Sequence, residues 1–288
     1  MGVCGVDQGA FRVKRSLIAT DMDRTLIYTR DAFELADPES VALTCVEYLN
    51  ATALSFITEK AARRLSDIVD TAVLVPTTTR TIAQFKRVQL PCGETQFAIT
   101  SNGGNILTSG VPDRAWRAAI DTAVRASAAS LDEVTRELRA RIAEDWVRKF
   151  RIAEDLFCYL VVEPELVPPD FLAEWQTWCG PRGWSVSRQS RKIYAIPQAV
   201  NKNKALSEVR ARAVAAGILD ADAVTLAAGD GVLDSDVLAA ADAAIRPRHG
   251  ELELLGWDRP HLTVTAAAGI RAGECIVDWF AAGGRLVQ

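Results

Sequence analysis

The sequence predicts an α/β protein with a Rossmann-like, mainly parallel sheet and an inserted α+β unit. Short apolar runs alternate with helical patterns in the first and last thirds of the chain, which is typical of parallel sheets. Several of these runs end in polar residues, as strands do at the ligand-binding edge of such sheets. The middle of the chain, roughly 106–194, instead combines long helical patterns with separate strands.

In the first third, apolar runs predict buried strands at 16–20, 72–75 and 97–100. Two further strand patterns, at 41–49 and 52–57, predict a hairpin. A helical pattern follows Thr58, and a second helix is expected from about Thr81.

The middle and last thirds predict a second set of elements. In the middle we expect helical structure at 113–150 with a break near 130, strands at 156–163, 184–187 and 192–196, and a helix from 168. In the last third we expect a helix at 201–214, another beginning near Asp234, and strands at 224–227, 243–245 and 261–264.

Composition limits the classes of function. The chain has 288 residues, 49% hydrophobic and 24% charged, which is enough for a large core plus an insertion. Its net charge of −4 provides no basic field, so we expect no nucleic-acid partner. No signal-peptide pattern and no apolar run of membrane-spanning length is present, so we expect a cytoplasmic protein with no membrane partner. No oligomeric state is predicted.

The cysteines and histidines argue against a zinc site. None of the cysteines forms a C-x-x-C pair, and the chain has only two histidines. We therefore expect reduced, mostly structural thiols at the six cysteines, which are Cys4, Cys45, Cys92, Cys158, Cys179 and Cys275.

Two carboxylates, Asp21 and Asp23, follow the first predicted strand in the pattern D-x-D-x-T. Carboxylates this close repel each other unless a cation or a shared proton lies between them. The pattern suits a Mg²⁺ site in which one carboxylate attacks phosphorus and the other handles the proton. The same pattern also occurs by chance in loops and calcium sites.

Three other segments at strand ends or helix starts carry comparable residues. Thr78 suits a phosphate oxygen beside free backbone N–H groups, or a helix cap. Lys202 and Lys204 oppose the dipole of a helix that they begin, so they either neutralise an anion or are solvated surface lysines. Asp230 and Asp234 suit an oxygen-only Mg²⁺ shell, or a helix cap.

Taken in order, these segments resemble the motifs of the haloacid dehalogenase (HAD) superfamily of phosphohydrolases. The match is D-x-D-x-T at 21–25, Thr78 with Arg80, Lys202 in V-N-K-N-K-A-L, and G-D-G-x-x-D at 229–234. The position of Lys202 and the S-N-G at 101–103 are similar to the Cof-type and sucrose-phosphatase-like branch.

The resemblance covers about 16–105 and 195–288 and implies two domains. It predicts a HAD core domain at 1–105 and 195–288, with a C2-type cap domain at 106–194. The hairpin at 41–57 follows the nucleophile, where the family has a mobile flap.

The sequence departs from the family pattern at three positions. Arg24 and Thr79 stand where the family usually has glycine, and Leu233 stands where asparagine is frequent. None of the three removes a chemical group that the mechanism needs. Arg24 adds bulk and charge at the mouth of the site.

The resemblance also implies roles for the motif residues. Asp21 is the expected nucleophile, which forms an aspartyl-phosphate, and Asp23 the expected general acid and base. A Mg²⁺ cofactor is expected on Asp21, the Asp23 backbone carbonyl, Asp230 and Asp234. Phosphate binding is expected from three residues, namely Thr78, Lys202 and Asn102.

The expected function is a Mg²⁺-dependent phosphatase acting on a small phosphate ester, with a sugar phosphate as the expected substrate. The alternatives are a phosphomutase of the same superfamily, and a catalytically weak regulatory or binding protein, suggested by Arg24 and Thr79. Candidate substrate-binding residues are Arg24, Arg80, Arg188, Arg191 and Lys192. The last three are equally consistent with exposed charges on strands.

Overall fold

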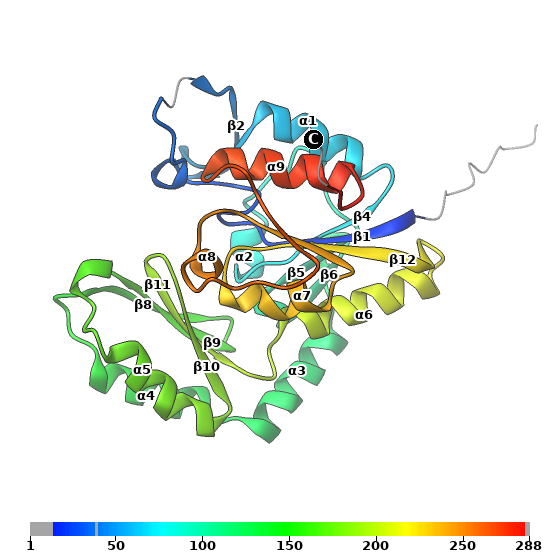
Figure 1. Cartoon of the computed structure of the whole chain (residues 1–288). Helices are drawn as coiled ribbons and strands as arrows, with labels where there is room; N and C mark the ends of the chain where they lie inside the picture. The colour runs from blue at the N-terminus through cyan, green and yellow to red at the C-terminus, as the bar shows by residue number, and fades with distance from the viewer. Residues whose placement is uncertain (1–13, 38–39, 286–288) are drawn as a thin grey trace, which may run out of the picture.

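A computed structural model describes residues 14–37 and 40–285 (Figure 1). Cys4 and the first two residues, Met1 and Gly2, lie outside this part of the chain. The cysteines within it are free thiols: Cys45, Cys92, Cys158, Cys179 and Cys275. Within the same residues, no helix is long and apolar enough to cross a membrane.

A five-stranded parallel sheet forms the centre of the molecule. Its order is β14 (Leu262–Val264), β13 (Ala243–Arg246), β12 (Leu219–Ala228), β1 (Lys14–Thr20) and β4 (Val73–Pro76). Thr20 at the end of β1 pairs with Ala228 on one side and Pro76 on the other. Because these three strands end level, the residues that follow them meet at one edge of the sheet.

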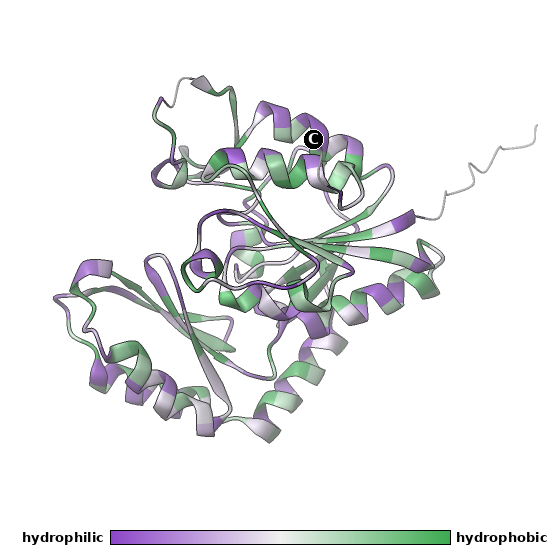
Figure 2. Cartoon of the chain, viewed as in Figure 1, coloured by the Kyte–Doolittle hydropathy of each residue, from purple (hydrophilic) through white to green (hydrophobic). Residues whose placement is uncertain are grey.

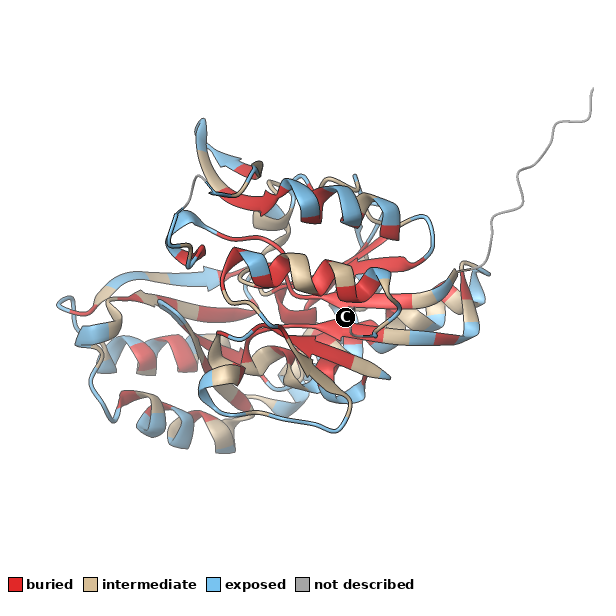
Figure 3. Cartoon of the chain, turned by 45° about the horizontal axis from the view of Figure 1, so that its top comes forward, coloured by how far each residue is buried: buried red, intermediate tan, exposed pale blue. Residues whose placement is uncertain are grey.

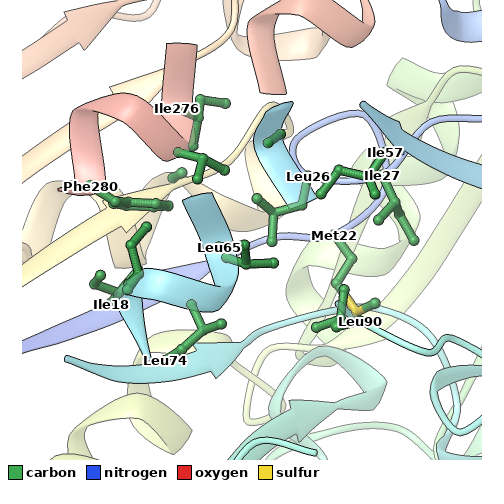
Figure 4. Packing of buried hydrophobic residues seen from close by; sticks show 14 of the residues in the cluster. Ile18, Met22, Leu26, Ile27, Ile57, Leu65, Leu74, Leu90, Ile276 and Phe280 are labelled. Atoms are coloured by element: carbon green, nitrogen blue, oxygen red, sulfur yellow. The ribbon is translucent and has the colours of Figure 1, made fainter. Parts of the chain in front are cut away.

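Helices cover both faces of this sheet (Figures 1 and 3). On one face lie α1 (Glu59–Ile68) and α9 (Ile270–Ala281), which pack on Ile18 and Leu74 (Figure 4). The other face, which includes Leu17 and Val75, packs against α6 (Lys202–Ala215) and α7 (Ser235–Ala240). Side chains of successive residues in a strand therefore pack in different hydrophobic clusters on the two faces of the sheet. This explains why these strands are rich in apolar residues (Figure 2).

Two small antiparallel sheets flank the parallel one. β2 (Leu43–Leu49) and β3 (Thr52–Thr58) form the predicted hairpin, and Thr58 caps α1 by accepting from the Ala61 N–H at 3.1 Å. The other sheet consists of β5 (Phe97–Thr100), β6 (Asn105–Thr108) and β7 (Val111–Pro112). The short helix α2 (Ile82–Phe85) follows Thr81, its N-cap.

The insertion is a four-stranded antiparallel sheet with helices on one side (Figure 1). Its strands are β8 (Val147–Ala153), β9 (Phe157–Val162), β10 (Trp184–Gln189) and β11 (Lys192–Pro197). Its helices are α3 (Arg114–Ser127), α4 (Leu131–Arg141) and α5 (Phe171–Cys179). It has its own core, in which Trp175 and Trp184 are fully buried. The predicted α/β fold with an inserted unit is confirmed.

The structure corrects several predicted elements. The helical stretch expected up to residue 150 is wrong, because α4 ends at Arg141 and Val147–Ala153 is strand β8. Val147 and Phe150 are three residues apart, so they mimic helical spacing on what is an edge strand of the sheet. β12 begins five residues before the predicted start, and β6, β7, α8 (Glu251–Leu254) and α9 were not predicted.

We propose domain boundaries slightly later than 106 and 194. Ile106 packs in the same cluster as Leu17 of the parallel sheet, whereas Ile196 packs in the core of the insertion. The cap would then extend from about α3 to the end of β11.

Candidate active site

Asp21 and Asp23 leave the sheet at the end of β1. The Asp21 N–H donates to the Ala228 carbonyl at 2.9 Å, which continues the pairing of β1 with β12 by one residue. Met22 separates the two aspartates in the sequence, and its side chain is fully buried in the core (Figure 4). This apolar anchor fixes the turn that carries the two carboxylates.

Lys202 brings two of the predicted motifs together. Its Nζ donates to Oδ1 of Asp21 at 2.8 Å and to Oδ1 of Asp234 at 2.6 Å, and its side chain is fully buried. Burial lowers the pKa of Lys202, but the two carboxylates outweigh it and hold that pKa above its ordinary value. Lys202 is therefore charged. Of the two lysines at the start of this helix, Lys202 lies in the site and Lys204 is exposed.

The S-N-G segment positions the start of α6. Asn201 caps this helix by accepting from the N–H groups of Asn203 and Lys204. Gly103 lies against it with a φ of +98°, and a Cβ there would be 2.3 Å from the Asn201 carbonyl oxygen. The Asn102 amide donates to the Val200 carbonyl at 3.2 Å. The Asn102 side chain thus holds the loop before Lys202, and its predicted contact with phosphate stays a prediction.

Three carboxylates form a cluster suited to a metal ion. Ligand atoms of Asp21, Asp230 and Asp234 all lie within 4.8 Å of one another, and all three residues are buried. Burial and repulsion from Asp234 raise the pKa of Asp21 to about 7, against the attraction of Lys202. Burial and Asp21 likewise raise the pKa of Asp230 well above its ordinary value. The Lys202 ammonium and the Arg24 guanidinium, which lies 3.6 Å from Asp230, do not balance three buried carboxylates, and an all-oxygen donor set fits Mg²⁺.

Proton and metal are expected to compete for this cluster. Because the pKa of Asp21 is about 7 when folded and near 3.8 when unfolded, metal-free stability falls as pH rises between these values. A Mg²⁺ ion at this cluster would bind the deprotonated carboxylates, so its stabilising effect is expected to increase over the same range. Thermal unfolding should show a larger rise in Tm on adding MgCl₂ at pH 7.5 than at pH 5. Equal shifts at both pH values would contradict this assignment.

Thr78 lies where β4 meets β5. Its N–H donates to the Ile99 carbonyl at 2.9 Å, and its own carbonyl accepts from the Asn102 N–H at 2.9 Å. The Thr78 hydroxyl oxygen accepts from the Arg80 N–H at 3.1 Å, so the hydroxyl proton is left to donate to a phosphate oxygen.

Arg80 holds Asp23 in a bidentate ion pair. Its Nε and Nη2 donate to the two Asp23 oxygens, both at 2.7 Å, and its Nη1 lies 3.0 Å from Oε2 of the buried Glu47. Burial raises the pKa of Asp23, but the Arg80 charge outweighs it and lowers that pKa to about 2. We therefore propose Arg80 as a positioning residue for Asp23 instead of a substrate ligand. Glu47, on hairpin strand β2, carried no sequence signal that would identify it.

Two residues of β11 reach the site from the insertion. The Tyr194 hydroxyl lies 3.4 Å from the Thr79 hydroxyl. The charges of Tyr194 and Asp23 raise the pKa of Lys192, so Lys192 belongs to the same group of charges as Asp23. Arg191 instead pairs with Glu163 at 3.0 Å and is half-exposed.

Arg24 has a strained backbone that His249 supports. Its φ of 63° is left-handed, a conformation natural for the glycine usual in the family and costing other residues on the order of 1 kcal/mol. The Gly269 N–H donates to Nδ1 of His249 at 3.0 Å, so Nε2 carries the proton and donates to the Arg24 carbonyl at 2.8 Å. Burial lowers the pKa of His249, which favours this neutral form. Sequence reasoning missed His249, although it closely follows a predicted strand.

Solved structures share this architecture. Sucrose-phosphatase from Synechocystis sp. PCC6803, crystallised with sucrose and phosphate, matches with a TM-score of 0.65 at 14% identity, covering 93% of this chain and 98% of that one. Thermoplasma acidophilum 0175 matches with a TM-score of 0.58 at 14% identity, covering 94% and 99%. The HAD subclass IIB sugar phosphatase BT4131 matches with a TM-score of 0.54 at 12% identity, covering 94% and 100%.

These matches define the class of fold. The chain has the fold of HAD subclass IIB phosphatases, a parallel-sheet core with an inserted cap, and the predicted resemblance is confirmed at this level. Comparisons with protein-family models and with curated proteins returned no match.

Proposed function

We propose that the protein is a Mg²⁺-dependent phosphatase that hydrolyses a small phosphate ester through an aspartyl-phosphate. The observation that carries the proposal is the meeting of Asp21, Asp230, Asp234 and Lys202 in one buried cluster at the edge of the parallel sheet. This set combines a nucleophile, an oxygen donor set for a hard cation and a cation for phosphate. A sugar phosphate is the proposed substrate, because neighbours of the same fold include sugar phosphatases.

The first step transfers the phosphoryl group to Asp21. Lys202 binds Oδ1 of Asp21, and we propose that Oδ2 attacks phosphorus while the bond to the leaving oxygen breaks. Asp23 gives its proton to that leaving oxygen. Thr78 and Lys202 hold the transferring phosphoryl oxygens. Asp21, Asp230 and Asp234 would hold a Mg²⁺ ion, which would supply positive charge to neutralise the phosphate.

The second step regenerates the enzyme. Asp23 accepts a proton from water, whose oxygen attacks phosphorus and releases phosphate from Asp21. Arg80 favours the carboxylate form of Asp23 that this step needs. An incoming phosphate ester adds negative charge beside Asp23 and raises its pKa, which supplies the protonated form needed in the first step.

Assays with p-nitrophenyl phosphate and a panel of sugar phosphates, with and without Mg²⁺, test the proposal. We expect Mg²⁺-dependent release of phosphate in stoichiometric amount. Transfer of the phosphoryl group to another sugar position would indicate a phosphomutase. No activity on any ester would indicate a regulatory or binding protein.

Replacing Asp23 by asparagine should slow hydrolysis of a sugar phosphate by roughly 10²–10⁴-fold, because the general acid is lost. The loss should be smaller for p-nitrophenyl phosphate, because p-nitrophenolate leaves without a proton. Comparing kcat for the two substrates checks this. Equal losses for both would contradict the role of Asp23 as the acid.

A further inference from the structure

A cavity of about 780 Å³ opens beside the carboxylate cluster. Asp230 lines it, together with residues of β10, the β10–β11 turn and α8. Figure 1 shows α8 beside that turn, and Ser187 of β10 donates to Glu251 of α8 at 3.2 Å. Because Asp230 belongs to both the cluster and the cavity lining, the far part of a substrate whose phosphate lies at the cluster could extend into this cavity.

Three arginines from separate segments line the cavity: Arg24 after β1, Arg188 on β10, and Arg248 after β13. Arg188 donates only to backbone carbonyls, those of Ser190 at 3.4 Å and Pro164 at 3.3 Å. In the part of the chain that the structure describes, the Arg248 guanidinium has no ion-pair partner. Arg24 differs from these two, because it lies 3.6 Å from Asp230 of the cluster and 3.4 Å from Glu34.

The carboxylates that line the cavity already have partners. Glu251 accepts from the Val232 N–H at 2.9 Å as well as from Ser187. Glu253 is paired with Arg246, which lies outside the cavity lining. Asp230 belongs to the proposed metal site. The guanidiniums of Arg188 and Arg248 therefore face this space without a carboxylate to neutralise them.

We propose that this cavity binds a leaving group that carries a second anionic group, a carboxylate or a phosphate. The proposal rests on the proposed phosphatase function and names its substrate class. Arg188 and Arg248 present planar guanidinium forks, which match both anions bidentately. Arg24 lines the same cavity but already has two carboxylate partners, Glu34 at 3.4 Å and Asp230 at 3.6 Å, so Arg188 and Arg248 carry the proposal.

A neutral sugar as the leaving group would leave these guanidiniums unpaired. A leaving group with a second anion gains charge-assisted hydrogen bonds to these guanidiniums that a neutral sugar lacks. Specificity for an anionic leaving group thus follows from the same arginines.

The test compares kcat/KM for three substrates in the presence of Mg²⁺. Fructose 1,6-bisphosphate carries a second phosphate, 3-phosphoglycerate carries a carboxylate, and fructose 6-phosphate has a neutral leaving group. We expect kcat/KM for at least one of the two anionic substrates to exceed that for fructose 6-phosphate by about tenfold or more. Arg188→Gln and Arg248→Gln should each reduce this ratio about tenfold. Arg148→Gln, on β8 and paired with Glu163, is the matched control and should preserve it.

A higher kcat/KM for fructose 1,6-bisphosphate or for 3-phosphoglycerate than for fructose 6-phosphate supports the proposal and identifies the anion. Equal kcat/KM for all three substrates, or a ratio unchanged in both variants, would overturn it. If no ester is hydrolysed, the proposed function fails separately. Calorimetric Kd values for fructose 1,6-bisphosphate and fructose 6-phosphate on the same proteins then decide the inference, and equal values would overturn it.

Discussion

Asp21→Asn is expected to abolish Mg²⁺-dependent phosphate release, with a loss on the order of 10⁵-fold in kcat. An amide does not attack phosphorus, so the covalent route is closed. The substitution also removes one of the three clustered carboxylates and the negative charge that pairs with Lys202. Both effects act at the same step, which is why this loss should exceed that from any other single change.

Initial rates with p-nitrophenyl phosphate measure this loss, and circular dichroism shows whether the variant is folded. Asp67→Asn is the control, because Asp67 is exposed on α1 and far from the sheet edge. We expect it to keep wild-type activity. Full activity in the folded Asp21→Asn protein would refute the assigned nucleophile.

Lys202→Met is expected to have the largest effect on stability, a loss of about 3–5 kcal/mol in the free energy of unfolding. It removes the ammonium that binds both Asp21 and Asp234 and leaves buried carboxylates without their cation. Mg²⁺ at the same cluster should restore part of this loss, because it supplies positive charge to the same oxygens.

Urea unfolding with and without MgCl₂ measures both effects. Lys204→Met is the matched control, because Lys204 lies on the same helical turn but is exposed. Its change should stay within about 0.5 kcal/mol. Equal stability of Lys202→Met and Lys204→Met in metal-free buffer would contradict the buried ion pairs of Lys202 with Asp21 and Asp234.

The strands that build the site could be predicted from sequence because burial on both faces gives each a continuous apolar run. Thr20 and Ala228 end such runs, and their level ends bring Asp21 and Asp230 together. Local patterns therefore sufficed for residues that directly follow a strand. Lys202 could be located because it begins a helix whose cap, Asn201, is recognisable.

The partners of these residues could not be predicted, because they come from distant segments with no local pattern. Glu47 reaches Arg80 from a hairpin, and His249 reaches the Arg24 carbonyl from far along the chain. The place of Arg248 in the cavity lining could not be predicted either, because it depends on the path of the chain after β13. Strand β8 was missed because an edge strand buries few side chains.

Trapping the covalent intermediate tests the central claim most directly. Borohydride reduces an acyl phosphate, so adding it during turnover should convert Asp21 to homoserine, which mass spectrometry of the digested protein detects. We predict this conversion at Asp21 alone, dependent on both substrate and Mg²⁺. Modification of another aspartate, or steady phosphate release with Asp21 never modified, would contradict the account.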